Sequence, residues 1–140
     1  MATATANLIT WSDRYSVGIA KIDSEHHKLV DLVNELYAAI LAGNPTSVTA
    51  KVLDGLAAYT LSHFATEEAL MKRYNYPGYT QHKAEHDKLV GQVKQLQQEL
   101  KAGKTTVSQE VMSFLQGWLI SHILGMDKKY TAHLQAAGVK

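Results

Sequence analysis

Cysteine is absent from this chain of 140 residues. Disulfides, thiolate metal ligands, iron–sulfur clusters and cysteine nucleophiles are therefore excluded within the chain. Proline is scarce as well. The chain has two prolines, Pro45 and Pro77, and each lies in a short stretch with Gly and Asn, which is typical of a break between helices. Any chemistry that the protein performs must come from other side chains.

Charge of one sign is not concentrated anywhere in the sequence. The net charge is +1, and Lys and Arg are spread along the chain, so no basic block indicates nucleic-acid binding and no acidic tail indicates a solvating segment. No apolar run approaches the roughly 20 residues that cross a bilayer. Residues 1–16 lack the basic and apolar segments of a secretory signal. We therefore expect a single cytoplasmic domain over residues 1–140, with no nucleic-acid partner and no membrane span.

Apolar residues recur at spacings of three and four, which predicts helices, and no alternating pattern indicates a strand. The expected helices are 23–42, 46–73, 79–102 and 108–134. Asp23 or Ser24 would cap the first helix, and Gly43 would help to end it. Residues 1–20 would form an arm packed across the domain. Helices of this length with short connections predict an all-α, antiparallel up-down-up-down four-helix bundle over residues 21–136.

One stretch of the chain pairs histidine with another metal-binding residue at helical spacing. His63 and Glu67 are four residues apart near the end of the second expected helix, and His82 and His86 are four apart at the start of the third. Side chains four apart share one face of a helix. Imidazole and carboxylate groups bind iron, zinc or manganese. These two pairs therefore predict part of a metal site.

An antiparallel bundle brings further candidates to the same half of the core. The first and third helices begin at the end where the second and fourth finish. His26 lies near the start of the first helix, and His122 and Asp127 lie in the last part of the fourth. The full set of candidate ligands is His26, His63, Glu67, His82, His86, His122 and Asp127.

A single inward histidine is more often a hydrogen-bonded core residue than a metal ligand. Here five histidines and two carboxylates share one half of the core, with no Lys or Arg at that level of the stripes. Each buried imidazole needs a hydrogen-bond partner, and each buried carboxylate needs a positive charge. Metal cations meet both needs. Seven ligands are too many for one tetrahedral zinc and predict two adjacent six-coordinate ions bridged by carboxylates. A metal-free bundle is the plain alternative.

Two histidines stay outside this set. His27 follows His26 directly, so its side chain points about 100° away on a helix. His133 lies beyond the site, near the C-terminus. We interpret both as structural or solvated residues.

The spacing between His122 and Asp127 departs from a regular helix. They are five residues apart, which places their side chains about 140° from each other in an ideal α-helix. Either Asp127 reaches the core from the flank, or a π-type turn brings it into line with His122. Such turns concentrate at functional sites, and Gly125 would ease the distortion.

Four stretches carry a family resemblance: WSDRYSVGIAKIDSEHHKL, HFATEEALM, HKAEHDKLV and WLISHILGMDKKY. They reach into all four expected helices. On these motifs the chain resembles the hemerythrins and is most similar to the single-domain bacteriohemerythrins. The resemblance implies a non-haem di-iron centre, with an oxo or hydroxo bridge between the two Fe ions, that binds O2 reversibly.

The resemblance also implies a role for each candidate ligand. His82, His86 and His122 would hold one iron. His26 and His63 would hold the other, which keeps an open position, and Glu67 and Asp127 would bridge the pair. No residue is expected to be catalytic.

An apolar pocket for O2 is implied on the same grounds, and its walls would be Phe64, Trp118, Leu119 and Ile123. The alternative is that these four side chains are simply core. Glu25 stands where the family often has glutamine. Glu25 directly precedes His26, and the difference would alter hydrogen bonding or redox behaviour at the site.

The expected function is O2 storage, transport or delivery, without catalysis. Di-iron oxygenases and oxidases use mostly carboxylate ligands, whereas a set dominated by neutral imidazoles favours return to the reduced state. An oxygen-consuming enzyme is a candidate recipient of the O2. Two alternatives stay open: a di-iron enzyme acting on peroxide, nitric oxide or ferrous iron, and an O2 or redox sensor module.

Overall fold

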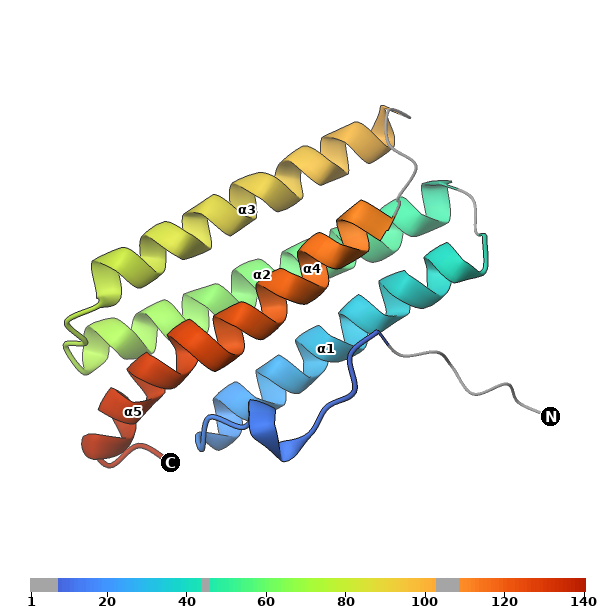
Figure 1. Ribbon diagram of the computed structural model, residues 1–140. Coiled ribbons are helices and arrows are strands. Elements are labelled where there is room, and N and C mark those ends of the chain that lie inside the picture. Colours follow the sequence, from blue (N-terminus) through green and yellow to red (C-terminus); the bar gives the residue numbers. More distant parts are fainter. Residues whose placement is uncertain (1–7, 44–45, 103–108) are drawn as a thin grey trace.

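The computed structural model describes residues 8–43, 46–102 and 109–140. Over these residues every regular element is a helix, as Figure 1 shows. The helices are α1 (Ala20–Leu41), α2 (Thr46–Arg73), α3 (Tyr79–Lys101), α4 (Gln109–Ser121) and α5 (Lys128–Ala136), with a π-helical segment, η2 (His122–Asp127), joining α4 to α5. α4, η2 and α5 run on as one rod, so the predicted all-α four-helix bundle is confirmed.

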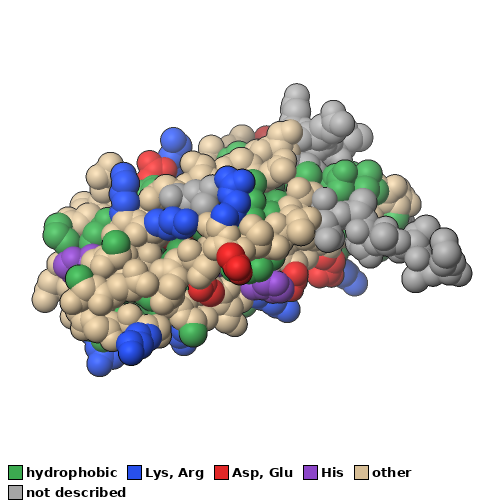
Figure 2. Space-filling view, turned by 60° about the horizontal axis from the view of Figure 1, so that its bottom comes forward, with side chains coloured by type: hydrophobic (Ala, Val, Ile, Leu, Met, Phe, Trp, Pro, Cys, Tyr) green, Lys and Arg blue, Asp and Glu red, His purple; other side chains and the backbone are tan. Residues whose placement is uncertain are grey.

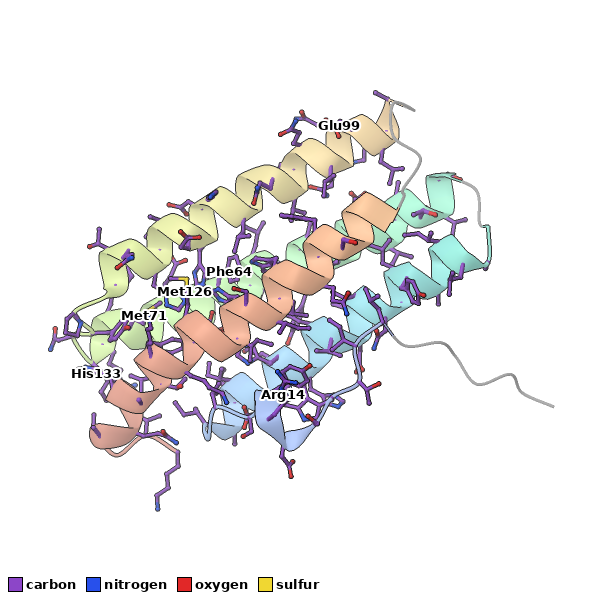
Figure 3. The ribbon with its side chains drawn as sticks, viewed as in Figure 1. Arg14, Phe64, Met71, Glu99, Met126 and His133 are labelled. Atoms are coloured by element: carbon purple, nitrogen blue, oxygen red, sulfur yellow. The ribbon has the colours of Figure 1, made fainter. Side chains whose placement is uncertain are left out.

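The helices are antiparallel, and α2 packs against both α1 and α3. α1 and α3 begin at the end of the bundle where α2 and α5 finish, at the left of Figure 1. In Figure 3 Met71, Met126 and His133 lie toward this end and Glu99 lies toward the other. The core along the bundle is aliphatic: Leu29, Val33, Leu36, Leu53, Leu56, Val93, Leu100, Leu115 and Leu134 are buried.

The first helix begins earlier than predicted. It starts at Ala20, after Ile19 in extended conformation, and neither Asp23 nor Ser24 is its N-cap. The carboxylate of Asp23 instead accepts hydrogen bonds from the Val17 backbone N–H at 2.7 Å and the Ser16 hydroxyl at 2.6 Å. Asp23 therefore ties the arm to the first turn of α1, and the helix extends back to the point where the arm joins it.

The other helix ends agree more closely with the prediction. α2 covers 46–73 as predicted, and α3 ends at Lys101, one residue before the expected end. Gly43 adopts a left-handed φ of +67° beyond α1, which lets the chain leave the helix without steric cost. Residues 44–45 and the proposed end signal at Gly103 lie outside the described residues.

The arm is fastened across the bundle as far as it is described, from residue 8 onward. It contains a short 3₁₀ turn, Asp13–Tyr15 (η1). The side-chain amide of Asn34 on α1 donates to the Ile9 carbonyl at 2.8 Å and accepts from the Ile9 N–H at 3.0 Å. Lys128 donates to the Arg14 carbonyl at 2.9 Å. The arm thus joins α1 to α5. Residues 1–7 lie outside the described part of the chain.

Substituting Gly18 with alanine is expected to destabilise the fold by about 1–2 kcal/mol, the cost of placing a Cβ in left-handed backbone. Gly18 has φ +79°, and an added Cβ would lie 2.2 Å from the Gln135 amide nitrogen. Gly91→Ala is the matched control, because Gly91 is an exposed residue inside α3 with open space around it. It should stabilise the fold by about 0.5–1 kcal/mol. Urea unfolding of both variants in the same metal state measures the difference, and equal midpoints would contradict the prediction.

The surface mixes side chains of both charges. Lys and Arg are interspersed with Asp and Glu on the face shown in Figure 2. Within the described ranges, every helix is too short or too polar to cross a membrane.

Candidate metal centre

All seven candidate ligands are buried in the half of the bundle that contains the α2–α3 turn. His26 comes from the first turns of α1, and His63 and Glu67 from the second half of α2. His82 and His86 come from the start of α3. The helical periods of these segments turn the polar side chains inward, next to the aliphatic core. The structure therefore brings together every ligand candidate that the sequence predicted.

The seven side chains form two overlapping clusters. One contains Glu67, His82, His86, His122 and Asp127, and the other contains His26, His63, Glu67 and Asp127. Within each cluster the potential ligand atoms lie within 4.8 Å of one another. Both carboxylates belong to both clusters, as expected of groups that bridge two ions.

The distances show how the carboxylates serve both clusters. Oδ1 of Asp127 lies 3.2 Å from His82 Nε2 and 2.9 Å from His122 Nε2, while its Oδ2 lies 2.8 Å from His26 Nε2. Oε1 of Glu67 lies 3.3 Å from His86 Nε2 and 3.4 Å from His63 Nε2. All five imidazoles thus present Nε2 to the same small volume.

The five-residue step in the last helical rod is accommodated by the π-type turn. Residues His122–Asp127 are π-helical, and Asp127 is fully buried and faces His122. The alternative, in which Asp127 reaches in from the flank of a regular helix, is therefore wrong. The Thr131 hydroxyl donates to the Asp127 carbonyl at 2.8 Å, which satisfies a carbonyl where the turn changes its hydrogen-bonding pattern.

The donor set fits metal cations. Among the described residues, the buried polar atoms without a hydrogen-bond partner come mostly from this cluster. They include both ring nitrogens of His26, Nε2 of His63 and His82, and both oxygens of Asp127. Unpaired atoms of this kind cost several kcal/mol when desolvated. Imidazole nitrogens and carboxylate oxygens that converge with so few hydrogen bonds are ligands that iron accepts.

Without metal, the cluster must balance its charge with protons. Burial opposes charge on His26 and His122, but the neighbouring Asp127 and Glu67 carboxylates outweigh it and raise the pKa of His26 to about 9 and that of His122 to about 10. For Asp127, burial and Glu67 oppose ionisation, and the histidines lower the pKa to about 2. The pKa of Glu67 is also held well below its usual range. In the metal-free cluster the two carboxylates are therefore paired with protonated His26 and His122.

Iron loading should release about two protons per chain at pH 8, because metal binds neutral imidazole and displaces the protons of His26 and His122. In the metal-free chain, the stabilisation from these two raised pKa values is complete below about pH 6.5. It is lost as the pH rises through about 9 to 10. An indicator dye in weak buffer measures the release, and unfolding from pH 6 to 10 measures the stability. Loading without proton release at pH 8 would contradict this charge state.

Three residues around the cluster hold its members in place. Glu25 lies 2.6 Å from His63 Nδ1, and Glu68 lies 2.8 Å from His86 Nδ1, each as the acceptor of the ring N–H. The Tyr130 hydroxyl donates to Glu67 Oε2 at 2.5 Å. Carboxylates on the far nitrogen of a ligating histidine orient the ring and raise its basicity.

The sequence did not point to Glu68 or Tyr130. Tyr130 has a signal in hindsight, since it lies three residues after Asp127 and continues the inner stripe once the π-type turn is counted. Nothing in the sequence distinguishes Glu68 from any other acidic residue beside a ligand.

The four predicted pocket walls are all buried. The ring of Phe64 stacks on His86 with centroids 3.7 Å apart and planes 2° apart, and it lies inside the bundle in Figure 3. Trp118 lies 6.1 Å from the His122 ring and 6.0 Å from Phe64. Leu119 and Ile123 are buried on the same rod. Phe64 and Trp118 thus place aromatic surface beside the His86 and His122 rings.

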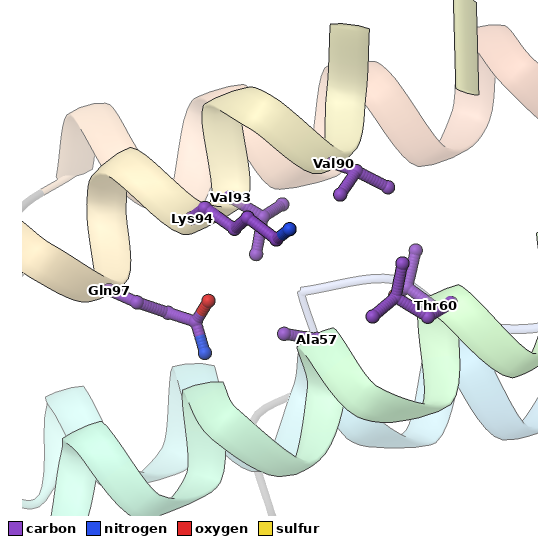
Figure 4. A pocket seen from close by; sticks show the side chains of 7 residues that line it. Ala57, Thr60, Val90, Val93, Lys94 and Gln97 are labelled. Atoms are coloured by element: carbon purple, nitrogen blue, oxygen red, sulfur yellow. The ribbon is translucent and has the colours of Figure 1, made fainter. Parts of the chain in front are cut away.

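Two surface hollows differ in their relation to the cluster. A groove of about 270 Å³ between α3 and α4 has His122 and Trp118 in its wall, so it borders one candidate ligand. The small apolar pocket in Figure 4 lies between α2 and α3. Its lining includes Ala57 and Thr60 of α2 and Val90 of α3. Its walls contain none of the seven candidate ligands.

The two excluded histidines lie apart from the cluster. His27 is exposed and has Nδ1 3.6 Å from an Asp31 oxygen. His133 is half-buried, and its Nε2 donates to the Tyr74 carbonyl at 2.7 Å.

Comparison with known proteins identifies the family of this chain. The family model described as "Hemerythrin HHE cation binding domain" matches residues 17–134. The chain belongs to the hemerythrin family. Membership confirms the prediction of O2 binding at a non-haem di-iron centre.

Individual hemerythrins are similar over nearly the whole chain. A bacteriohemerythrin of Methylococcus capsulatus is 37% identical over 130 residues, covering 92% of this chain and 98% of that protein. A hemerythrin-like protein of Naegleria gruberi is 35% identical over 130 residues, covering 93% and 97%. A solved wild-type hemerythrin superposes with a TM-score of 0.85 at 38% identity, covering 91% of this chain and 98% of that one.

Proposed function

We propose that this hemerythrin carries O2 reversibly, for storage, transport or delivery, rather than consuming it. The observation that supports the proposal is the pair of overlapping clusters with Glu67 and Asp127 in common. In the proposed assignment His82, His86 and His122 hold one iron, and His26 and His63 hold the other. Glu67 and Asp127 bridge them. When bound, the irons supply the electrons that O2 binding requires.

The unequal clusters support an open position on one iron. The cluster of His82, His86 and His122 offers five ligand atoms with the bridges, and the cluster of His26 and His63 offers four. O2 would bind at the second. Phe64, Trp118, Leu119 and Ile123 would exclude water around it, which slows irreversible loss of the oxidised site.

The ligand set supports carriage over catalysis. Five imidazoles accompany only two carboxylates, and fewer anionic ligands stabilise oxidised iron less than a carboxylate-rich site does. The Tyr130 hydroxyl donates a hydrogen bond to Glu67, which makes that carboxylate a weaker electron donor to iron. We further propose that residues 1–140 act as one domain and that an oxygen-consuming enzyme receives the O2. The cytoplasmic location stays a prediction from the sequence.

Metal analysis combined with optical spectra through repeated oxygenation cycles tests the proposal. Loading with ferrous iron without oxygen should give two irons per chain. An absorption band should then appear with O2 and disappear on deoxygenation over many cycles. One zinc per chain, or a spectrum unaffected by O2, would contradict the assignment. Sustained turnover of peroxide, nitric oxide or ferrous iron would instead favour an enzyme.

A further inference from the structure

The two ring nitrogens of His63 face opposite partners. Nε2 points to the cluster, 3.4 Å from Glu67, and Nδ1 lies 2.6 Å from Oε1 of Glu25. The imidazole is fully buried, whereas the Glu25 side chain is 18% exposed. With Nε2 left free for metal, Nδ1 carries the proton and donates it to the carboxylate. His63 is therefore held in one tautomer and one orientation by a residue of another helix.

We propose that Glu25 is a positioning residue that strengthens O2 binding, by placing a negative charge on the far side of a ligand to the open iron. The inference rests on the proposed function. Glu25 acts through His63 and touches neither iron nor O2 in this assignment.

The physical reason is a difference in charge between the two states of the centre. O2 binding withdraws electrons from iron, so the centre becomes more positive. A carboxylate hydrogen-bonded to a ligating imidazole makes that imidazole a stronger electron donor, and its charge acts across a buried path where screening is weak. Both effects favour the oxidised, O2-bound state over the reduced one.

Glu68 provides an internal comparison, because it makes the same contact with His86 on the other cluster. The charge of Glu68 is partly offset, since Lys83 Nζ lies 3.9 Å from its carboxylate. In the described part of the chain, no Lys or Arg forms an ion pair with Glu25. The uncompensated charge thus lies beside the iron that would take O2.

Glu25→Gln keeps the shape of the side chain and removes its charge. We expect O2 affinity to fall about tenfold, through faster O2 release, which is the lower end of the 10–100-fold range by which loss of such a partner lowers metal affinity or activity. The midpoint potential should rise, by about 59 mV for a tenfold change in a one-electron step. Glu35→Gln is the matched control, an exposed glutamate on the same helix, and it should leave affinity and potential unchanged.

Iron content separates failure of this inference from failure of the proposed function. If the wild-type chain binds iron and O2, but Glu25→Gln binds two irons with unchanged affinity and potential, Glu25 has no such role. If the wild-type chain binds no iron, the proposed function itself is wrong.

A second measurement decides the matter if Glu25→Gln fails to load iron. In the zinc-loaded wild-type chain, proton NMR should show the Nδ1–H of His63 far downfield and protected from solvent exchange. Glu25→Asp, which keeps the carboxylate, should retain iron and the lower potential. The absence of that proton signal, or loss of the low potential in Glu25→Asp with iron retained, would overturn the inference.

Discussion

Replacing His63 with alanine is expected to remove most of the iron from the protein, and O2 binding with it. His63 is one of only four residues in its cluster, and its Nε2 lies 3.4 Å from the bridging Glu67. Removing a residue that merely orients a ligand costs 10–100-fold in metal affinity, so losing the ligand itself should cost more than about 100-fold. Metal analysis of the loaded and desalted variant gives the answer directly.

His133→Ala is the control for this experiment. His133 bonds to the Tyr74 carbonyl and contacts the Tyr76 ring, away from both clusters. Its loss should lower stability by about 1 kcal/mol and leave two irons per chain. Equal loss of iron in both variants would show that folding, and not ligation, determines iron content, and the residue assignment would fail.

Phe64→Ala is expected to have the largest effect on stability. Phe64 is buried against His86, Trp118 and His122, and truncating a buried phenylalanine costs about 3–5 kcal/mol. The Phe64 and His63 ring centroids are 6.1 Å apart, so the cavity would open close to the proposed O2 position and admit water. We therefore expect the O2-bound form to lose its oxygenated spectrum faster.

Chemical unfolding and the decay of the oxygenated spectrum measure the two effects on Phe64→Ala separately. Phe64→Leu keeps the wall apolar and should lose less stability, with a decay rate near that of the wild type. If Phe64→Ala lowers stability but the decay rate does not change, Phe64 is simply core, and its role as a pocket wall is wrong.

Much of this architecture could be predicted because helical spacing is a local property. His63 and Glu67 had to share a face, and an antiparallel bundle had to bring the start of one helix beside the end of the next. The π-type turn was one of two predicted alternatives. The five-residue spacing from His122 to Asp127 is compatible with both a regular helix and a π-type turn. Only the tertiary structure could therefore decide between the two alternatives.

The errors and omissions concern contacts that depend on packing. Asp23 is a good N-cap residue by type, but the arm places Ser16 and Val17 within its reach. The Asp23 carboxylate binds these two residues and does not cap the helix. Whether Glu68 or Tyr130 contacts the cluster depends on how far apart the helices lie, and sequence spacing does not give that distance. The contact of Glu25 with His63 joins residues 38 positions apart.

Every candidate ligand lies in one half of the bundle. The two halves are therefore stabilised by different interactions. The half around Leu36, Leu53 and Leu100 is held by aliphatic contacts, which persist whatever the metal content. The other half contains buried carboxylates and imidazoles, whose desolvation must be offset by bound cations or by protons on the imidazoles. We therefore expect loss of iron to destabilise the half with the α2–α3 turn more than the opposite half.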